Sequence, residues 1–303
     1  MGNADFAIPS IARLHSLTHE VVAAVTNPDK QQGRGRNPSP TPVALFARKH
    51  NISTIQPDSL KNNSLVSELM EVRPHLFVVV AFKILPPELL IIPEYGCVNL
   101  HGSLLPKYRG AAPIQWALMN GDSMTGLTTF ILSPSVDTGD ILLKKEVVIF
   151  PDDDFGSLSQ RMSQLGASLL VETIRRIDAQ DHGPFPQDSS LATKAPKIRP
   201  DMCRINWDRP AREVRNQIRA LSPVPGAYTV LRGRRLKLFR SIISGMTTSS
   251  CGEIVLVKQD RFVVSCSKDS LEIQEVQLEG KRRMPARDFL LGSFLSEGER
   301  LGV

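Results

Sequence analysis

An asparagine and a histidine two positions apart, Asn99 and His101, are the first candidates for chemistry in this chain. On a β-strand such residues project from the same face, so the amide and the imidazole would share one site, while Val98 and Leu100 pack the other way. The amide can donate a hydrogen bond to the oxyanion of a tetrahedral intermediate, and the imidazole can donate another or relay a proton. The pair suits acyl transfer, although an isolated Asn-x-His is more commonly structural.

Two carboxylates, Asp137 and Asp140, follow the next expected strand, Thr125–Leu132. Each is a candidate for a catalytic group beside the histidine. A carboxylate near an imidazole orients the ring and favours its protonated form, and it can hold a water for proton transfer from an attacking amine. The run Asp137-Thr138-Gly139-Asp140 equally suits a hydrogen-bonded turn between strands. These residues alone leave open whether Asp137 or Asp140 is the catalytic group.

The elements that must position these residues follow a β/α rhythm in the first half of the chain. Short β-rich runs alternate there with helical patterns, through Glu20–Thr26, Pro42–His50, His75–Ala81, Pro87–Ile92 and Gly96–His101. This alternation predicts an α/β fold with a Rossmann-like, doubly wound and mostly parallel sheet covered by helices on both faces. Active sites in such sheets lie outside the carboxyl ends of the strands.

The start of the chain lacks one element of that fold. Met1–Ser10 has the pattern of a strand-to-helix loop that runs into a helix, with no strand before it. A doubly wound sheet usually begins with a central strand, and its loss exposes two ladder edges. We therefore expect the first strand to be missing, through a start placed too late or through truncation.

The last third of the chain has a different pattern. A stretch rich in Pro, Asp, Ser and Lys is followed by the helical segment Pro210–Leu221 and by short, regularly spaced strands, which suggest a small OB-like β-barrel. We expect these strands at Ala227–Leu231, Arg235–Phe239, Gly252–Lys258, Arg261–Cys266 and Leu271–Leu278. The predicted domains are a catalytic domain over 1–180, a linker over 181–204 and a barrel domain over 205–303.

Charge divides the chain in the same way. The net charge is +6, with 17 Lys and Arg against 19 Asp and Glu in residues 1–195, and 20 against 12 in residues 196–303. A basic excess of this size suits a part that binds a polyanion, because cations that neutralise phosphates release counterions. A solvated basic surface is the alternative interpretation of the composition.

Several classes of protein are disfavoured by the sequence. No apolar run approaches the roughly 20 residues that cross a bilayer, and no signal peptide pattern is present, so we expect a cytoplasmic protein. Four widely spaced cysteines predict reduced thiols and no metal site. Gly33-Arg34-Gly35-Arg36 does not have the spacing of a nucleotide-binding phosphate loop.

A longer motif contains the Asn-x-His pair. The string from Asn99 to Gln115, especially SLLPKYRGAAPIQ, resembles the motif of the folate-dependent formyltransferase family, and VDTGDIL resembles the family loop that supplies a catalytic carboxylate. The resemblance implies that Asn99, His101 and Asp137 are catalytic and that the formyl donor is 10-formyltetrahydrofolate, with no metal. It also implies a donor cleft formed by Ser103, Leu104, Leu105, Pro106, Phe82, Lys83, Ile84 and Leu85.

The acceptor is indicated by further similarities. The loop Asn27–Pro40 resembles the basic loop of family members that formylate initiator methionyl-tRNA, and segments of the C-terminal domain resemble the barrel of those members. The tRNA contacts implied are Arg34, Arg36, Arg234, Arg235, Lys281 and Arg282. The alternatives are an amino-sugar nucleotide acceptor and a non-catalytic RNA-binding relative. We expect a monomer.

Overall fold

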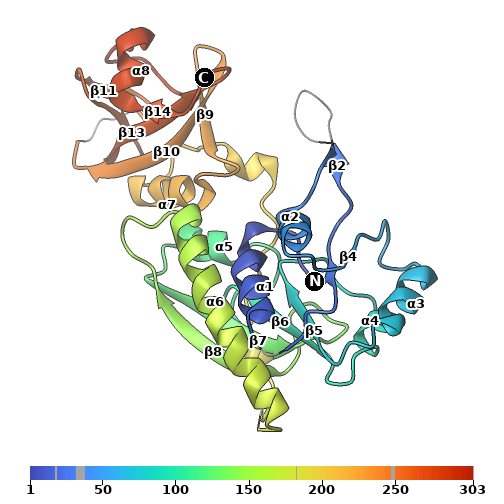
Figure 1. Cartoon of the computed structure of the whole chain (residues 1–303). Coiled ribbons are helices and arrows are strands. Elements are labelled where there is room, and N and C mark those ends of the chain that lie inside the picture. The colour runs from blue at the N-terminus through green and yellow to red at the C-terminus, as the bar shows by residue number, and fades with distance from the viewer. Residues whose placement is uncertain (18, 32–37, 182, 247–249, 303) are drawn as a thin grey trace. The chain divides into compact units, whose positions relative to one another are not determined.

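The chain divides into two compact units in the computed structural model, which describes residues 1–17, 19–31, 38–181, 183–246 and 250–302 (Figure 1). Unit 1 comprises Met1–Pro113, Thr125–Val148 and Ser159–Ala195. Unit 2 comprises Ile114–Met124, Ile149–Leu158 and Pro196–Val303.

Unit 1 contains short strands and helices in alternation. The helices are α1 (Ile8–His15), α2 (Pro42–Lys49), α3 (Asn63–Glu71), α4 (Pro87–Leu90) and most of α6 (Phe155–Asp178). The strands are β1 (Ala24–Val25), β2 (Lys30–Gln31), β3 (Pro38–Ser39), β4 (Thr54–Ile55), β5 (Phe77–Val80), β6 (Cys97–His101), β7 (Met124–Ile131) and β8 (Ile141–Val148). Short 3-10 helices span Asp5–Ala7 and Ser189–Leu191.

The sheet of unit 1 is mixed, with its parallel strands on one side. Its strands follow the order β5-β6-β7-β8, in which β5 and β6 are parallel and β6 and β7 antiparallel. The parallel pair β1 and β4 lies beyond β5. Met1 and Gly2 connect the two groups, because Gly2 N donates to Val25 O and Val80 N donates to Met1 O. The expected Rossmann-like α/β fold is confirmed.

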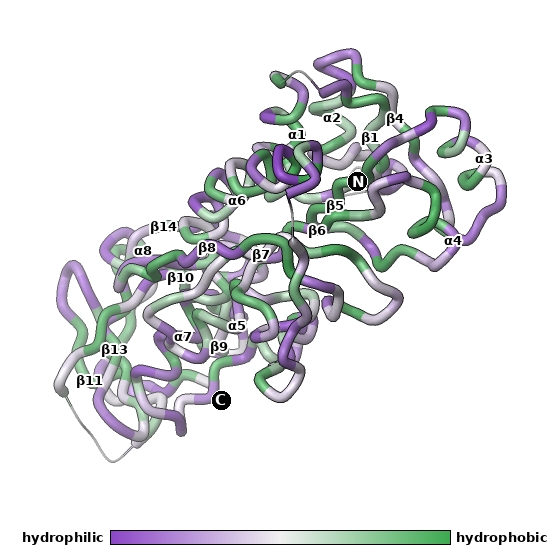
Figure 2. Tube along the Cα trace, turned by 90° about the horizontal axis from the view of Figure 1, so that it is seen from below, coloured by the Kyte–Doolittle hydropathy of each residue, from purple (hydrophilic) through white to green (hydrophobic). Residues whose placement is uncertain are grey.

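Helices cover both faces of this sheet. Val98 packs with Ile174 and Ile177 of α6 and with Leu14 of α1, on one face. The other face carries α3 and α4, in a cluster formed by Leu65, Leu69, Phe77, Val79, Leu89 and Cys97. Figure 2 shows the hydrophobic residues along β5 and β6 that this sandwich buries. A strand buried on both faces is apolar at almost every position, as the sequence FVVV of β5 is.

Local caps explain where two of the helices begin. Thr41 precedes α2, its side chain accepts a hydrogen bond from Ala44 N, and Pro42 occupies the first turn, where a missing N–H costs nothing. Asn62 precedes α3 and its side chain accepts from Ser64 N. Each cap satisfies one amide that the first turn of a helix leaves unpaired.

Unit 2 is built on an antiparallel sheet. Its strands are β9 (Ala227–Leu231), β10 (Arg234–Ser244), β11 (Ile254–Val257), β12 (Phe262–Ser265), β13 (Ser270–Leu278) and β14 (Met284–Pro285), in the order β11-β12-β13-β10-β9 with β14 beside β13. Its helices are α5 (Pro113–Asn120), α7 (Ala211–Leu221), α8 (Ala286–Ser293) and the 3-10 helix Pro200–Cys203. The expected strands after Ala227 and the expected helix before them are thus confirmed within a few residues.

The C-terminal segment closes this sheet into a barrel. Ile254 N donates to Glu299 O and Leu301 N donates to Gly252 O, which ties the segment to the β11 side. Gly302 N donates to Val230 O in β9, the strand at the other end of the sheet order. Closure removes the open edges that would otherwise invite pairing with another chain.

One helix of unit 2 has a strongly amphipathic pattern. Ala211, Val214, Ile218 and Leu221 recur at three- and four-residue spacing, and all four side chains are buried in the core of the barrel. That spacing places them on one stripe of α7, which faces the sheet. Arg212 and Glu213, between these positions, are exposed.

Strand β1 is shorter than the sequence predicts. The pattern favours a strand over Glu20–Thr26, but only Ala24–Val25 pairs as one. Ala24 N donates to Ser53 O on the β4 side, whereas the other side meets Met1–Gly2 only at its end. Within the described part of the chain, residues 20–23 therefore have no neighbouring strand.

Among the described residues, no helix combines the length and apolarity needed to span a membrane.

Candidate active site

His101, the last residue of β6, has a hydrogen bond at one ring nitrogen and a carboxylate near the other. Its side chain is buried, and Nε2 lies 2.9 Å from the backbone oxygen of Tyr108. A carbonyl oxygen only accepts hydrogen bonds, so Nε2 must carry a proton in this arrangement. The second ring nitrogen, Nδ1, lies 3.8 Å from Asp137 Oδ2. The imidazole is thus oriented with Nδ1 toward a carboxylate.

Asp137, rather than Asp140, is the carboxylate beside His101. Its Oδ2 accepts a hydrogen bond of 2.8 Å from Gly110 N, which fixes the carboxylate in place. Asp140 is exposed, and its backbone oxygen accepts from Ile131 N, as a turn residue would. Of the two carboxylates, geometry thus favours Asp137 as the candidate partner of His101.

The backbone at Asp137 is in an uncommon conformation. Its φ is +53°, in the left-handed region that Asp tolerates better than most residues. Ala81 and Tyr108, which flank the same end of the sheet, also have positive φ values of 50° and 61°. Such conformations cost about 1–2 kcal/mol each and persist where surrounding contacts hold them.

Gln187 makes the contacts that hold the Asp137 loop, and the sequence alone did not indicate this residue. Its side-chain Nε2 donates to Asp137 O at 2.9 Å and to Gly139 O at 2.8 Å. Its Oε1 accepts from Arg109 Nη2 at 2.7 Å. Gln187 lies in the predicted linker, and no local motif marks it, because its role depends on a partner 50 residues away.

Asn99 has the orientation expected of an oxyanion donor. It pairs with Phe130 of β7 and alternates with Val98, whose side chain lies in the α6 cluster. Asn99 thus shares a sheet face with His101, as the strand period predicts. Its side chain is half-buried and has no hydrogen-bond partner among the described residues, which leaves the amide available to a ligand.

Hydrogen bonds of Ser103 fix the loop that follows His101. The Ser103 hydroxyl donates to Lys107 O at 2.6 Å, and Thr128 Oγ1 donates to Ser103 O at 2.7 Å. The side chains of Ser103 and Leu105 are fully buried. Of the four residues predicted to contact the donor here, Leu104 and Pro106 have partly exposed side chains, whereas Ser103 and Leu105 would contribute backbone groups.

The second loop predicted to contact the donor follows β5. Because β5 and β6 are parallel and Val80 pairs with Leu100, the loop Ala81–Leu85 leaves the same edge of the sheet as His101. Lys83 and Ile84 are exposed, Phe82 is half-buried and Leu85 is buried. Ile84 is 69% exposed, which leaves apolar surface on this loop.

The cysteines play no nucleophilic part in this arrangement. All four are free, and burial raises the pKa of Cys97 and of Cys266 to about 12. Thiols with such values stay protonated and unreactive near neutral pH. Within the described ranges, no group of three or more His, Cys, Asp or Glu side chains could hold a metal ion.

In unit 2 the fold brings two basic segments together. Leu236 of β10 pairs with Leu278 of β13, and Glu279 N donates to Arg235 O at 2.8 Å. The four predicted contacts that flank these pairs are exposed: Arg234, Arg235, Lys281 and Arg282. Some 45 residues separate Arg234 from Glu279 in the sequence, yet they are hydrogen-bonded. The other two predicted contacts, Arg34 and Arg36, lie outside the described residues.

Comparison with known proteins gives consistent matches along the chain. The family model described as formyl transferase matches residues 1–174, and that of the formyl transferase C-terminal domain matches residues 197–293. A methionyl-tRNA formyltransferase from Geobacter sulfurreducens is 44% identical over 303 residues, which cover 100% of this chain and 95% of that protein.

Two solved structures share the fold at lower identity. An N-formyltransferase from Helicobacter canadensis, solved with folinic acid and dTDP-3-aminofucose, has a TM-score of 0.68 at 19% identity, over 93% of this chain and 97% of that one. HypX from Aquifex aeolicus, solved with tetrahydrofolic acid, has a TM-score of 0.63 at 19% identity, over 84% of this chain and 44% of that one.

Proposed function

The chain belongs to the formyl transferase family, and from that premise we propose that it transfers the formyl group of 10-formyltetrahydrofolate to the α-amine of methionyl-tRNA. The products are formylmethionyl-tRNA, used in translation initiation, and tetrahydrofolate. The proposal is supported by the 44% identity to a protein of that activity along the whole chain. The structural observation that carries it is the approach of Asp137 to His101 at the carboxyl end of β6.

The chemistry assigned to this site is direct attack of the amine on the formyl carbon. The side-chain amide of Asn99 donates to the oxygen that becomes negative in the tetrahedral intermediate. In its protonated form, His101 donates a second hydrogen bond from Nδ1, the nitrogen that is not engaged with Tyr108 O. Asp137 orients the ring and accepts the proton that the attacking amine loses, directly or through a water.

The residues next to the site fit a flat, aromatic donor. Exposed Ile84 and the partly exposed side chains of Phe82, Leu104 and Pro106 supply apolar surface, and the loop backbones supply hydrogen-bonding groups. Ligand sites are commonly apolar with a few polar groups that fix orientation. Buried Ser103, Leu105 and Leu85 keep the two loops in place, and Lys83 is free to contact a carboxylate of the donor.

The acceptor is assigned to the basic surface of unit 2. Arg234, Arg235, Lys281 and Arg282 lie at one end of the sheet, where cations from two segments can contact neighbouring phosphates. Arg34 and Arg36 are proposed as further contacts from the sequence alone. From the sequence we also propose a catalytic domain over 1–180, a linker over 181–204 and a barrel domain over 205–303. We further propose that the protein is a cytoplasmic monomer.

The test is a formyl transfer assay with three acceptors in parallel: charged initiator methionyl-tRNA, an amino-sugar nucleotide, and none. Transfer to methionyl-tRNA alone is the expected result. Transfer to the sugar would keep the mechanism and refute the acceptor, and release of formate without an acceptor would indicate a hydrolase. Binding of tRNA without any transfer would mark a non-catalytic relative and refute the proposed function.

A further inference from the structure

Residues 193–195 of unit 1 pair with the loop that follows His101. Arg109 N donates to Thr193 O at 2.9 Å, and Ala195 N donates to Arg109 O at 2.7 Å. These two hydrogen bonds form a parallel bridge at Arg109. The backbone of the loop is therefore held by a segment that lies far away in the sequence.

The two backbones approach each other closely at Gly110. A Cβ at this position would lie 2.5 Å from Ala195 O, which is shorter than the contacts that real Cβ atoms make, and the φ of Gly110 is +128°. Ala195 is fully buried, and its backbone oxygen also accepts from Ala112 N at 3.1 Å. The 193–195 segment is thus packed against the loop at a position that requires glycine.

The residues on either side of Arg109 contact the two groups proposed for catalysis. Tyr108 O lies 2.9 Å from His101 Nε2, and Gly110 N donates to Asp137 Oδ2 at 2.8 Å. One carbonyl and one amide of the same loop therefore hold the imidazole and the carboxylate. Because Arg109 lies between them, the pairing at Arg109 also fixes how these two groups face each other.

Thr193 contacts both peptide groups of Tyr108. Its hydroxyl oxygen, Oγ1, accepts from Tyr108 N at 2.8 Å. Its backbone oxygen accepts from Arg109 N, which belongs to the same peptide group as Tyr108 O. The φ of Tyr108 is +61°, a conformation that aromatic residues rarely adopt and that neighbouring contacts must stabilise. Thr193 therefore stabilises the conformation in which Tyr108 O faces the imidazole.

This carbonyl determines which nitrogen of His101 exchanges a proton. A carbonyl oxygen only accepts hydrogen bonds, so Nε2 keeps its proton in the neutral ring as well as in the charged one. Nδ1, at 3.8 Å from Asp137 Oδ2, is then the nitrogen that gains and loses a proton. The opposite tautomer would leave Tyr108 O without its hydrogen bond.

We propose that Thr193 is a positioning residue for formyl transfer. Through the peptide groups of Tyr108 it holds His101 in the tautomer with the proton on Nε2, and so presents Nδ1 to Asp137. This role rests on the proposed function, because it requires His101 and Asp137 to take part in the reaction. It is distinct from the role of Gln187, whose contacts hold the loop of the carboxylate.

The test compares the unchanged chain with Thr193→Val, Thr193→Ser and Ser190→Ala. Valine has nearly the shape of threonine but no hydroxyl, whereas serine keeps the hydroxyl. Ser190 is the control, because it lies a few residues earlier and its hydroxyl donates to Asp188. Thr193 is exposed, so the midpoint of thermal unfolding should stay nearly unchanged in all three variants.

Two measurements are made on each protein. Labelling the six histidines with ¹⁵N reports both ring nitrogens of each, and a His101→Asn variant assigns the signals of His101. The spectra are recorded without substrate, at a pH at which the ring is neutral. Steady-state formyl transfer to methionyl-tRNA then gives kcat and KM.

One dominant tautomer should give well-separated signals for the two ring nitrogens of His101 in the unchanged chain. Thr193→Val should move these signals toward each other and lower kcat by about three- to tenfold, the factor that corresponds to one hydrogen bond, with KM little changed. Thr193→Ser should restore the separated signals and keep kcat within about twofold of the unchanged chain. Ser190→Ala should change neither quantity.

Unchanged His101 signals in Thr193→Val would overturn the proposal even if kcat fell, because Thr193 would then act by another route. Changed signals with an unchanged kcat would also overturn it, since the tautomer would have no part in the reaction. So would equal losses in Thr193→Val and Thr193→Ser. An unchanged chain with separated His101 signals but no formyl transfer would instead refute the proposed function.

Discussion

The side-chain amide of Gln187 donates a hydrogen bond to the backbone oxygen of Asp137, across 50 residues of sequence. The same amide holds Gly139, and Arg109 holds the Gln187 oxygen in turn. The proposed catalytic carboxylate is therefore positioned by a residue outside every motif of the chain. A left-handed backbone at Asp137 depends on such external support.

Replacing Asp137 tests the proton acceptor. Asp137→Asn keeps the size of the side chain and tolerates the positive φ, so the fold should be retained. Loss of the carboxylate should lower kcat for formyl transfer by about 10²–10⁴. Steady-state kinetics give the value, and Asp140→Asn, at an exposed turn position, is the matched control. Equal loss in both variants would refute the assignment to Asp137.

Replacing Asn99 tests the oxyanion donor. Its amide has no partner among the described residues, so Asn99→Ala should leave the midpoint of thermal unfolding nearly unchanged. Removal of one such donor typically lowers turnover by about 10²–10³. We expect that loss in kcat, with little change in KM for methionyl-tRNA. A variant of near-normal kcat would exclude Asn99 from the chemistry.

Replacing Gln187 tests positioning. Gln187→Glu keeps an acceptor for Arg109 but cannot donate to Asp137 O or Gly139 O, and should lower kcat by about ten- to a hundredfold while KM stays similar. Ser189→Ala is the control, because the Ser189 hydroxyl only accepts a long hydrogen bond of 3.4 Å from Arg109. If Gln187→Glu changed only the unfolding midpoint, the residue would be structural alone.

Replacing the basic residues of unit 2 tests their proposed role in tRNA binding. The double variant Lys281→Ala, Arg282→Ala should raise KM for methionyl-tRNA, with kcat little changed, because these exposed side chains are assigned to binding. The slope of log affinity against log salt should become shallower by about one for each phosphate that a cation no longer neutralises. Lys258→Ala, on the β11–β12 turn, is the control: it removes one exposed cation that is not assigned to tRNA binding, and KM should stay unchanged. An unchanged salt dependence would place the tRNA elsewhere.

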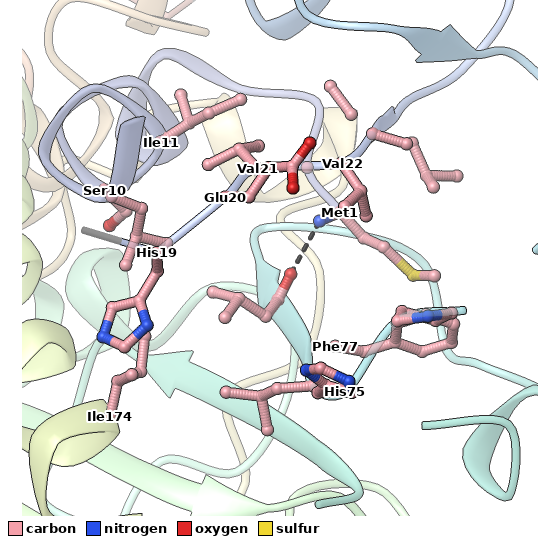
Figure 3. Close-up of a pocket in the computed structure, with 18 of the residues that line it drawn as sticks. Met1, Ser10, Ile11, His19, Glu20, Val21, Val22, His75, Phe77 and Ile174 are labelled. Atoms are coloured by element: carbon pink, nitrogen blue, oxygen red, sulfur yellow. Dashed lines mark hydrogen bonds between the residues drawn. The ribbon is translucent and has the colours of Figure 1, made fainter. Parts of the chain in front are cut away.

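The buried ammonium of Met1 predicts a pH effect on stability. The Met1 nitrogen donates to Val78 O (Figure 3), and burial lowers the pKa of this ammonium to about 5 in the folded chain, against 8.0 in the unfolded one. Between these values the unfolded chain binds a proton that the folded chain does not, so the free energy of unfolding falls as the pH is lowered from 8 to 5. The total would be at most roughly 4 kcal/mol.

An N-terminally acetylated chain provides the comparison, because acetylation removes the charge and keeps a donor for Val78 O. Urea unfolding across this pH range should show the two chains converging at high pH and diverging toward pH 5. Parallel curves would mean that the ammonium is not buried in solution.

Local sequence patterns predicted most of the elements. The β/α rhythm, the apolar run of β5 and the regular short strands after Ala227 were confirmed in type, with boundaries that differ by a few residues. The predicted strand Glu20–Thr26 was wrong in extent, because a strand needs a partner and residues 20–23 have none among the residues that the structure describes. The sequence pattern predicts which residues favour a strand, but the length of the strand depends on how many of them pair with a neighbouring strand.

The sequence by itself determined the family, the chemical types at the site and the shared face of Asn99 and His101, because motif and strand period are local properties. Only the tertiary structure placed Asp137 rather than Asp140 beside His101, revealed the contacts of Gln187, and joined Arg234 and Arg235 to the segment of Lys281. These relationships join residues far apart in the chain. They depend on how the strands pair and how the loops fold back, which no local pattern contains.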